Sequence, residues 1–191
     1  MKTKPLPKFE AIALENVPEC STLLFYGGTK VTEWFGNNIY KHQYKPPAYH
    51  AAFYIERGRC LNVGKFKSVT KITDDFLSNR RIDVISYKYI RKDQVDLLKD
   101  AAYDDADKAK LARLAPTYDW KGFLRFGLKF IRQSKGNDFC SENVVQIFNT
   151  QKIKVSKFVD YDTAPWDLLD FALENPDQCK IRNLWTGGKF K

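Results

Sequence analysis

The chain has few of the residues on which metal and redox sites depend. Its 191 residues include two histidines and four cysteines, and the cysteines are far apart in the sequence: Cys20, Cys60, Cys140 and Cys179. Without a Cys-x-x-Cys pair, neither a zinc site nor a thioredoxin-type motif is supported, although two disulfides are arithmetically allowed. We therefore expect no metal and no cofactor.

Long hydrophobic runs are also missing. A transmembrane helix needs about eighteen or more apolar residues in a row, and the sequence has no such stretch. The first residues, Met1-Lys-Thr-Lys-Pro5, continue into the chain without the apolar region of a secretory signal. A cytoplasmic location is the default expectation. An enzyme acting on a cell wall would then need release by lysis or delivery by a phage particle.

Negative charge is in deficit. The chain has 32 Lys and Arg residues against 23 Asp and Glu, for a formal net charge of +9. Such a balance favours anionic partners, namely nucleic acid, acidic glycopolymers or a surface of anionic phospholipid headgroups. The basic residues are spread along the chain, with local density at 65–71 and 152–157, and no RNA-binding signature accompanies them. No specific nucleic-acid partner is predicted, and a solvated basic face is the simpler interpretation.

What the chain does contain is a large apolar fraction. Hydrophobic residues make up 43% of it and aromatic residues 15%, which is enough to bury a core. It has no internal repeat, low-complexity tract or linker, so residues 1–191 are expected to form a single domain. Periodicity predicts strands at 22–26, 49–55, 60–63, 82–90, 153–159 and 180–184, and helices at 93–114, 120–133, 140–148 and 164–173. We expect an α+β fold, with a central antiparallel sheet on which helix 140–148 packs.

Cys140 and His50 are the residues with the clearest chemical potential. Cys140 opens the predicted helix 140–148, where backbone N–H groups and the positive end of the helix dipole favour a thiolate. His50 begins a strand, and the small Ala51 and Ala52 beside it leave room for a helix to pack closely. An imidazole beside the thiol would complete its activation. Taken alone, however, a cysteine that begins an apolar helix is more often a packed core thiol.

The order of the motifs resembles a known family. The run Tyr49-His-Ala-Ala-Phe-Tyr-Ile-Glu-Arg-Gly-Arg-Cys-Leu-Asn-Val-Gly64 resembles the His-bearing hairpin of the circularly permuted papain-like fold, in the NlpC-type superfamily. Phe139-Cys-Ser-Glu-Asn-Val-Val145 resembles its nucleophile motif, Leu23–Gly28 its opening strand, and Tyr118-Asp119-Trp120 the Tyr-Asp that precedes the Cys helix. The YiiX/YaeF-like permuted amidases of bacteria are the most similar members. The lecithin:retinol acyltransferase group is more distant, because its Asn-Cys-Glu-His motif differs.

The resemblance implies a role for each of three residues. Cys140 would attack an acyl carbon, His50 would take and return its proton, and Asn62 would orient the imidazole. Many members carry Glu or His in the third position. A tight hairpin turning at Arg57-Gly58 does not place Asn62 directly opposite His50, so a bulge or a diagonal contact is required.

Other candidate residues are less firmly indicated. Asp74 and Asp83 are reserve candidates for the third role. Tyr49, Tyr118 and Trp120 are candidates for binding substrate in the cleft, although aromatic residues in so aromatic a domain more often belong to the core.

The predicted function is that of a cysteine hydrolase, an amidase or peptidase that works through a thioester acyl-enzyme. The family points to peptide, cell-wall or acyl-lipid substrates, and the positive charge suits an anionic wall or membrane. Two alternatives remain open: a lipid acyl hydrolase or acyltransferase, and a catalytically silent binding or structural protein that retains the fold. The sequence predicts no oligomeric state.

Overall fold

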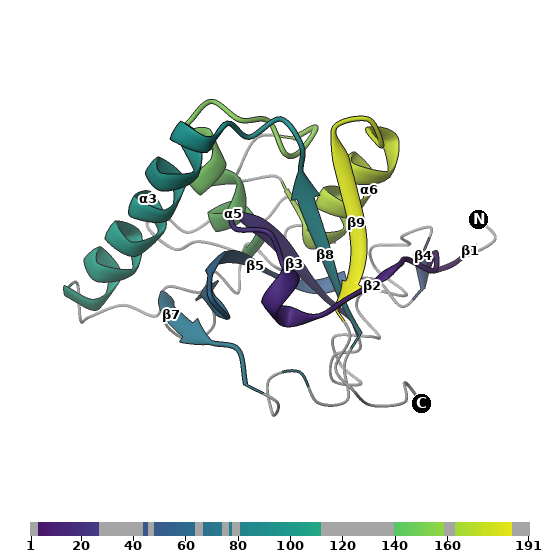
Figure 1. Cartoon of the computed structure of the whole chain (residues 1–191), viewed down its shortest axis with the longest axis horizontal. Coiled ribbons are helices and arrows are strands. Elements are labelled where there is room, and N and C mark those ends of the chain that lie inside the picture. Colours follow the sequence, from purple (N-terminus) through teal and green to yellow (C-terminus); the bar gives the residue numbers. More distant parts are fainter. Residues whose placement is uncertain are drawn as a thin grey trace, which may run out of the picture.

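The computed structural model describes residues 4–26, 44–45, 48–63, 67–73, 77, 81–111, 140–158 and 163–184. These residues form a mixed α+β structure with one seven-stranded sheet and three α-helices (Figure 1). The strands of the sheet are β2 (Ala11–Ile12), β3 (Ser21–Tyr26), β5 (Ala48–Glu56), β6 (Arg59–Val63), β7 (Lys67–Lys71), β8 (Ile82–Tyr87) and β9 (Cys179–Leu184). The helices are α3 (Lys92–Leu111), α5 (Cys140–Asn149) and α6 (Pro165–Glu174), with a short 3-10 turn η1 (Leu14–Asn16). A separate parallel pair joins β1 (Lys4–Pro5) to β4 (Tyr44–Lys45).

The strands lie in the order β2-β9-β8-β3-β5-β6-β7. Every neighbouring pair from β9 to β7 is antiparallel, which confirms the predicted antiparallel sheet in its centre. The sheet as a whole is mixed, however, because β2 joins β9 in parallel. Strand β2 is two residues long, too short for alternation to reveal it. Strand β7 was also missed, because its sequence was interpreted as part of a basic cluster.

The sheet divides the core into two parts. On one side, residues of α3, α5 and α6 share a buried cluster with Leu24 and Phe53 of the sheet. On the other side, Leu23 and Phe25 pack with residues of the N-terminal segment. Alternate residues of β3 therefore face opposite layers, as the period of a strand requires. In Figure 1, α3 (teal) lies toward the β7 end of the sheet and α6 (yellow) toward β9.

Helix α5 is held on the sheet by its apolar face. Phe148 is fully buried, and its ring packs edge-on against Phe53 and Tyr87 at centroid distances of 5.3 and 4.9 Å. Val144 and Val145, one turn earlier, join the same cluster. The prediction that the helix beginning at Cys140 packs on the sheet is confirmed.

Two predicted strands differ from the structure. Strand 82–90 ends at Tyr87, where the chain turns. Residues 153–158 form no strand: Ile153 and Val155 are buried, but the Lys154 carbonyl accepts a hydrogen bond from the Tyr89 hydroxyl at 2.5 Å. The alternation there reflects packing without strand pairing. Residue 159 and the predicted helix 120–133 lie outside the described residues.

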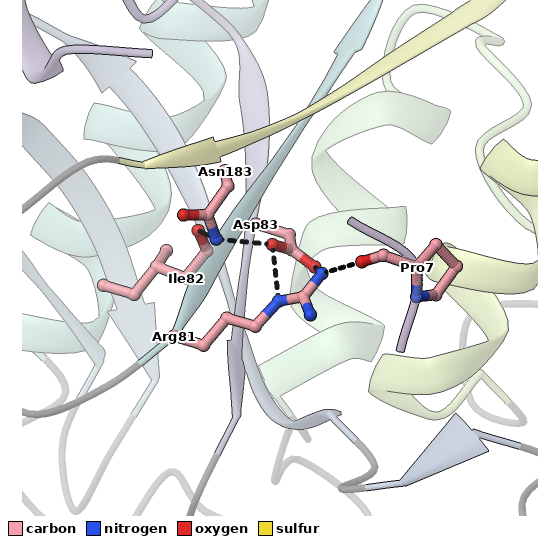
Figure 2. Close-up of polar contacts among 5 residues, drawn as sticks. All are labelled: Pro7, Arg81, Ile82, Asp83 and Asn183. Atoms are coloured by element: carbon pink, nitrogen blue, oxygen red, sulfur yellow. Dashed lines mark hydrogen bonds and ion pairs between the residues drawn. The ribbon is translucent and has the colours of Figure 1, made fainter. Parts of the chain in front are cut away.

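A buried ion pair connects three segments at one end of the sheet (Figure 2). Asp83 of β8 is fully buried and accepts two hydrogen bonds from Arg81, at 3.0 Å from Nε and 2.9 Å from Nη2. The Asn183 amide of β9 donates to the same carboxylate at 2.9 Å, and Arg81 Nη2 donates to the Pro7 carbonyl at 2.6 Å. Since β3 lies between β8 and β5, Asp83 has a structural role here and is no partner for His50. The other reserve candidate, Asp74, lies outside the described residues.

We predict that Asp83→Ala destabilises the fold strongly. Removing the carboxylate leaves the Arg81 guanidinium without its ion-pair partner, and breaking such a buried pair typically costs about 3–5 kcal/mol. Urea denaturation followed by tryptophan fluorescence measures the loss. Arg91 and Asp93 provide a matched control with the same spacing and nearly the same geometry, 3.1 and 3.0 Å, on an exposed surface. Asp93→Ala should change stability little. Equal losses for the two substitutions would contradict the proposed importance of the buried pair.

Candidate active site

His50 and Asn62 are brought together by the hairpin of β5 and β6. The His50 Nε2 atom lies 2.6 Å from Asn62 Oδ1, within hydrogen-bond distance. In the register of the hairpin, Phe53 is opposite Leu61, so Asn62 is placed diagonally and not directly across from His50. A register shift between Tyr54 and the turn accompanies this arrangement. The diagonal contact required at the level of sequence is therefore present.

The hydrogen bond to Asn62 defines the tautomer of the neutral His50 imidazole. The carbonyl oxygen of Asn62 can only accept, so His50 Nε2 must carry the proton. The lone pair of the neutral ring is then on His50 Nδ1, its basic nitrogen. The rings of Phe25 and Tyr49 flank the imidazole, with centroids 5.3 and 6.3 Å away. Tyr49, one of the three predicted substrate-binding residues, thus lies beside His50, whereas Tyr118 and Trp120 fall outside the described residues.

Cys140 is the first residue of α5 and is buried, with 1% of its surface exposed. Burial raises the pKa of its thiol to about 12, and backbone N–H groups of Ala51 and Ser141 act in the opposite direction. The sulfur therefore lies beside the backbone of Ala51, the residue that follows His50. A neutral thiol is the resting form at ordinary pH.

Strands β5 and β6 separate next to Ala51. Among the described residues, their pairing extends from Glu56 opposite Arg59 to Phe53 opposite Leu61, and Ala51 lies beyond its end. The Ala51 N–H is directed at the Cys140 sulfur instead of at a partner in β6. We call this opening the β5–β6 fork. His50 and Asn62 lie on the two strands at this opening, and the thiol of Cys140 lies beside the Ala51 backbone.

Comparison of the four cysteines distinguishes Cys140. All four are free and buried, and burial raises the pKa of Cys20 and Cys60 to about 12 and of Cys179 to about 11. Cys20 donates its thiol proton to the Val95 carbonyl at 3.5 Å, which favours the protonated form. Only at Cys140 do backbone N–H groups point toward the sulfur and favour a thiolate.

A polar cluster fixes the first turn of α5. Asn143, one turn after Cys140, donates to Asp105 Oδ2 of α3 at 2.7 Å, and Lys67 Nζ of β7 lies 2.8 Å from the same oxygen. On the other side, the Ser141 hydroxyl donates to the Thr163 carbonyl at 2.5 Å. The helix is thus tied to α3, to the sheet and to the segment before α6. Sequence reasoning missed this cluster. The one indication in the sequence was Asn143, a polar residue within the apolar part of the predicted helix 140–148.

No group of three or more His, Cys, Asp or Glu side chains in the described ranges is arranged to hold a metal ion. The candidate reactive groups at the fork are an imidazole, an amide and a thiol. Such a set can transfer a proton and form a covalent bond to carbon.

The buried thiol predicts a loss of stability in alkali. An unfolded cysteine ionises near pH 9, whereas Cys140 in the fold resists ionisation up to about pH 12, so stability is lost as the pH rises between these values. At a pH of about 10.5 this one thiol should account for about 2 kcal/mol of the loss. Urea denaturation of Cys140→Ala at pH values of about 8 and 10.5 should show a loss smaller by that amount than in the unmodified protein.

The matched comparison is Cys60→Ala. Burial alone raises the pKa of the Cys60 thiol to about 12, so this substitution should reduce the loss of stability in alkali equally. A resting thiolate paired with a charged imidazole would behave differently. In that case Cys140→Ala would lose as much stability in alkali as the unmodified chain, while Cys60→Ala would still lose less.

The comparisons with known proteins add no relative to these observations. No protein-family model, no curated protein and no solved structure matches the chain. The likeness to permuted papain-like amidases therefore stays a prediction, and the functional argument depends on the residues of this chain alone.

Proposed function

We propose that the protein is a cysteine hydrolase that cleaves an amide bond through a thioester on Cys140. The observation that supports this most directly is the 2.6 Å contact between His50 Nε2 and Asn62 Oδ1 at the β5–β6 fork. In the neutral imidazole this contact puts the proton on Nε2 and the lone pair on His50 Nδ1, which is the basic nitrogen of the ring. The Cys140 sulfur lies at the same fork, beside the Ala51 N–H and at the start of a helix. A base, an orienting amide and a nucleophile are the parts that acyl transfer needs.

In the first half of the reaction, His50 Nδ1 takes the thiol proton while the sulfur attacks the carbonyl carbon. The pair of electrons in the C=O bond moves to oxygen, and backbone N–H groups at the start of α5 stabilise the resulting oxyanion. The tetrahedral intermediate collapses, the C–N bond breaks, and His50 donates its proton to the departing amine. The acyl group is left on Cys140 as a thioester.

In the second half, His50 takes a proton from water, which attacks the thioester carbon. The C–S bond then breaks, the sulfur recovers its proton from His50, and the product leaves as a carboxylic acid. Asn62 keeps the imidazole in one orientation and one tautomer throughout, so it acts as a positioning residue.

The substrate class follows from less specific features. A net charge of +9 suits a substrate in an anionic polymer or at an anionic surface, and the family resemblance points first to peptides of the cell wall. Tyr49, with its ring beside His50, is placed to contact the acyl or leaving group. An acyl lipid as substrate, and a fold without turnover, are the two competing hypotheses.

A thiol-labelling experiment tests the proposal. Folded protein is treated with iodoacetamide, and the modified cysteines are identified by mass spectrometry over time. We expect Cys140 to react first of the four thiols, and His50→Ala to slow that reaction by about 100-fold or more, as loss of a general base does. Cys60, equally buried, is the internal control. If Cys140 reacts no faster than Cys60, or if His50→Ala has no effect, the protein is not a thiol hydrolase of this kind.

Asn62→Ala tests the positioning role separately. Loss of the hydrogen bond frees the imidazole to rotate and to change tautomer, so labelling of Cys140 should slow by about tenfold and less than with His50→Ala. The pH at which the rate rises should shift as well, which a purely structural role would not cause. Ser68 is opposite Asn62 in the register of β6 and β7 and is exposed, so Ser68→Ala is the matched control and should leave both quantities unchanged.

A further inference from the structure

The segment after α5 forms a pocket far from the β5–β6 fork along the helix. The pocket has a volume of about 330 Å³, and its wall includes Lys152, Lys154 and Lys157 together with Val145 and Phe158. Cys140 begins α5, whereas this pocket lies at the other end of the helix. We call residues 152–158 the basic ridge.

The basic ridge is held in one conformation. Ile153 and Val155 point into the core and are 5% and 1% exposed, so the intervening Lys154 is directed outward. The backbone of Lys154 is fixed by the Tyr89 hydroxyl, as described above. Ser156 is buried, and its hydroxyl accepts the backbone N–H of Phe158 at 3.1 Å. The backbone of the ridge is therefore preformed and needs little ordering on binding.

Phe158 is exposed against the usual preference of its side chain. It is 53% exposed, and Leu97 and Leu111 are the other large hydrophobic residues exposed to a comparable degree among the described residues. Both of those lie on α3, Leu97 near acidic residues and Leu111 beside Lys108 and Lys110. Phe158 differs from them in lining the pocket described above together with three lysines. An exposed aromatic ring next to lysines combines the apolar and cationic groups that interfacial membrane anchors use.

The charge of the ridge favours an anion. Lys157 is paired with Glu174, but Lys152 and Lys154 have no acidic partner in the part of the chain that the structure describes. The carboxyl end of α5, close to these lysines, has a negative partial charge of about half a unit. Two full positive charges exceed that half charge, so the ridge keeps a net positive potential.

We propose that the basic ridge docks on an anionic phospholipid surface. Lys152 and Lys154 contact headgroup phosphates, and Phe158 enters the boundary between headgroups and acyl chains. No helix in the described ranges is long and apolar enough to cross a bilayer, so this is attachment at the surface. Bases of single-stranded nucleic acid also stack on exposed aromatic rings, but nucleic-acid sites use several such rings, and the ridge has one.

This docking does not depend on the proposed hydrolase activity. Cys140→Ala should bind membranes as the unmodified chain does, whereas variants of the ridge should keep the His50-dependent labelling of Cys140. Failure of one proposal thus leaves the other standing.

The test is co-sedimentation of the full chain with vesicles. Binding is compared between phosphatidylcholine vesicles and phosphatidylcholine vesicles that contain phosphatidylglycerol. We expect binding to the anionic vesicles only, weakened by added salt. Replacing both lysines in a Lys152→Gln, Lys154→Gln variant should weaken it by roughly 25-fold, at about fivefold for each lysine. Phe158→Ala should weaken it by about fivefold through the lost apolar contact.

The matched control changes the same residue types elsewhere. Lys92 and Lys110 are exposed on α3, so a Lys92→Gln, Lys110→Gln variant has the same loss of charge as the double ridge variant. This control should bind as the unmodified chain does, and thermal unfolding should confirm that all variants remain folded. Equal weakening by the control and the ridge variant would mean that net charge alone drives binding. Binding of the chain to glycerol phosphate or to a single-stranded oligonucleotide, without binding to vesicles, would also overturn the proposal.

Discussion

The separation of β5 from β6 is the constraint on which the candidate site depends. Had the pairing continued past Phe53, the Ala51 N–H would bond to a residue of β6, and the Cys140 sulfur would have no place at the strand. The opening also explains why His50 and Asn62 contact each other diagonally. The small side chain of Ala51 makes the approach of α5 sterically feasible, whereas Ala52 faces the other side of the sheet. Phe148 at the far end of the helix holds α5 there.

Burial and reactivity oppose each other at Cys140. Raising the thiol pKa to about 12 makes a thiolate at neutral pH unfavourable by several kcal/mol. A nucleophile in such a place needs a base that takes its proton during the attack, which is the role that the Asn62-oriented His50 is suited to fill. Backbone N–H groups at Ala51 and Ser141 reduce the cost but do not remove it. The mechanism that fits is therefore general-base activation and not a permanent ion pair.

How much of this the sequence could predict depends on the range of the interactions. The hairpin, the helix that begins at Cys140 and the need for a diagonal contact follow from local patterns, and the structure agrees with each. The cluster of Lys67, Asp105 and Asn143 could not be predicted, because it joins residues 38 positions apart through side chains. Whether Cys140, His50 and Asn62 form a working site stays a prediction, since motif order does not measure reactivity.

The incorrect strand at 153–159 shows the limit of periodicity more sharply. Alternating burial there is real, because Ile153 and Val155 enter the core while Lys154 faces outward. Alternation reports which side chains are buried, however, and not whether the backbone has a partner. Here the Tyr89 hydroxyl takes the place of a neighbouring strand.

The two proposed surfaces lie at opposite ends of α5, and this has a consequence for the substrate. A helix of 10 residues is about 15 Å long, so the basic ridge and the Cys140 sulfur are separated by roughly that distance and joined by a rigid element. If α5 points away from a bilayer docked at the ridge, the fork lies about one helix length from the membrane. An ester bond at the level of the headgroups would not reach the sulfur without leaving the bilayer. An amide in a polymer or peptide that extends from the surface would reach it, so membrane docking in that orientation is compatible with the amidase hypothesis.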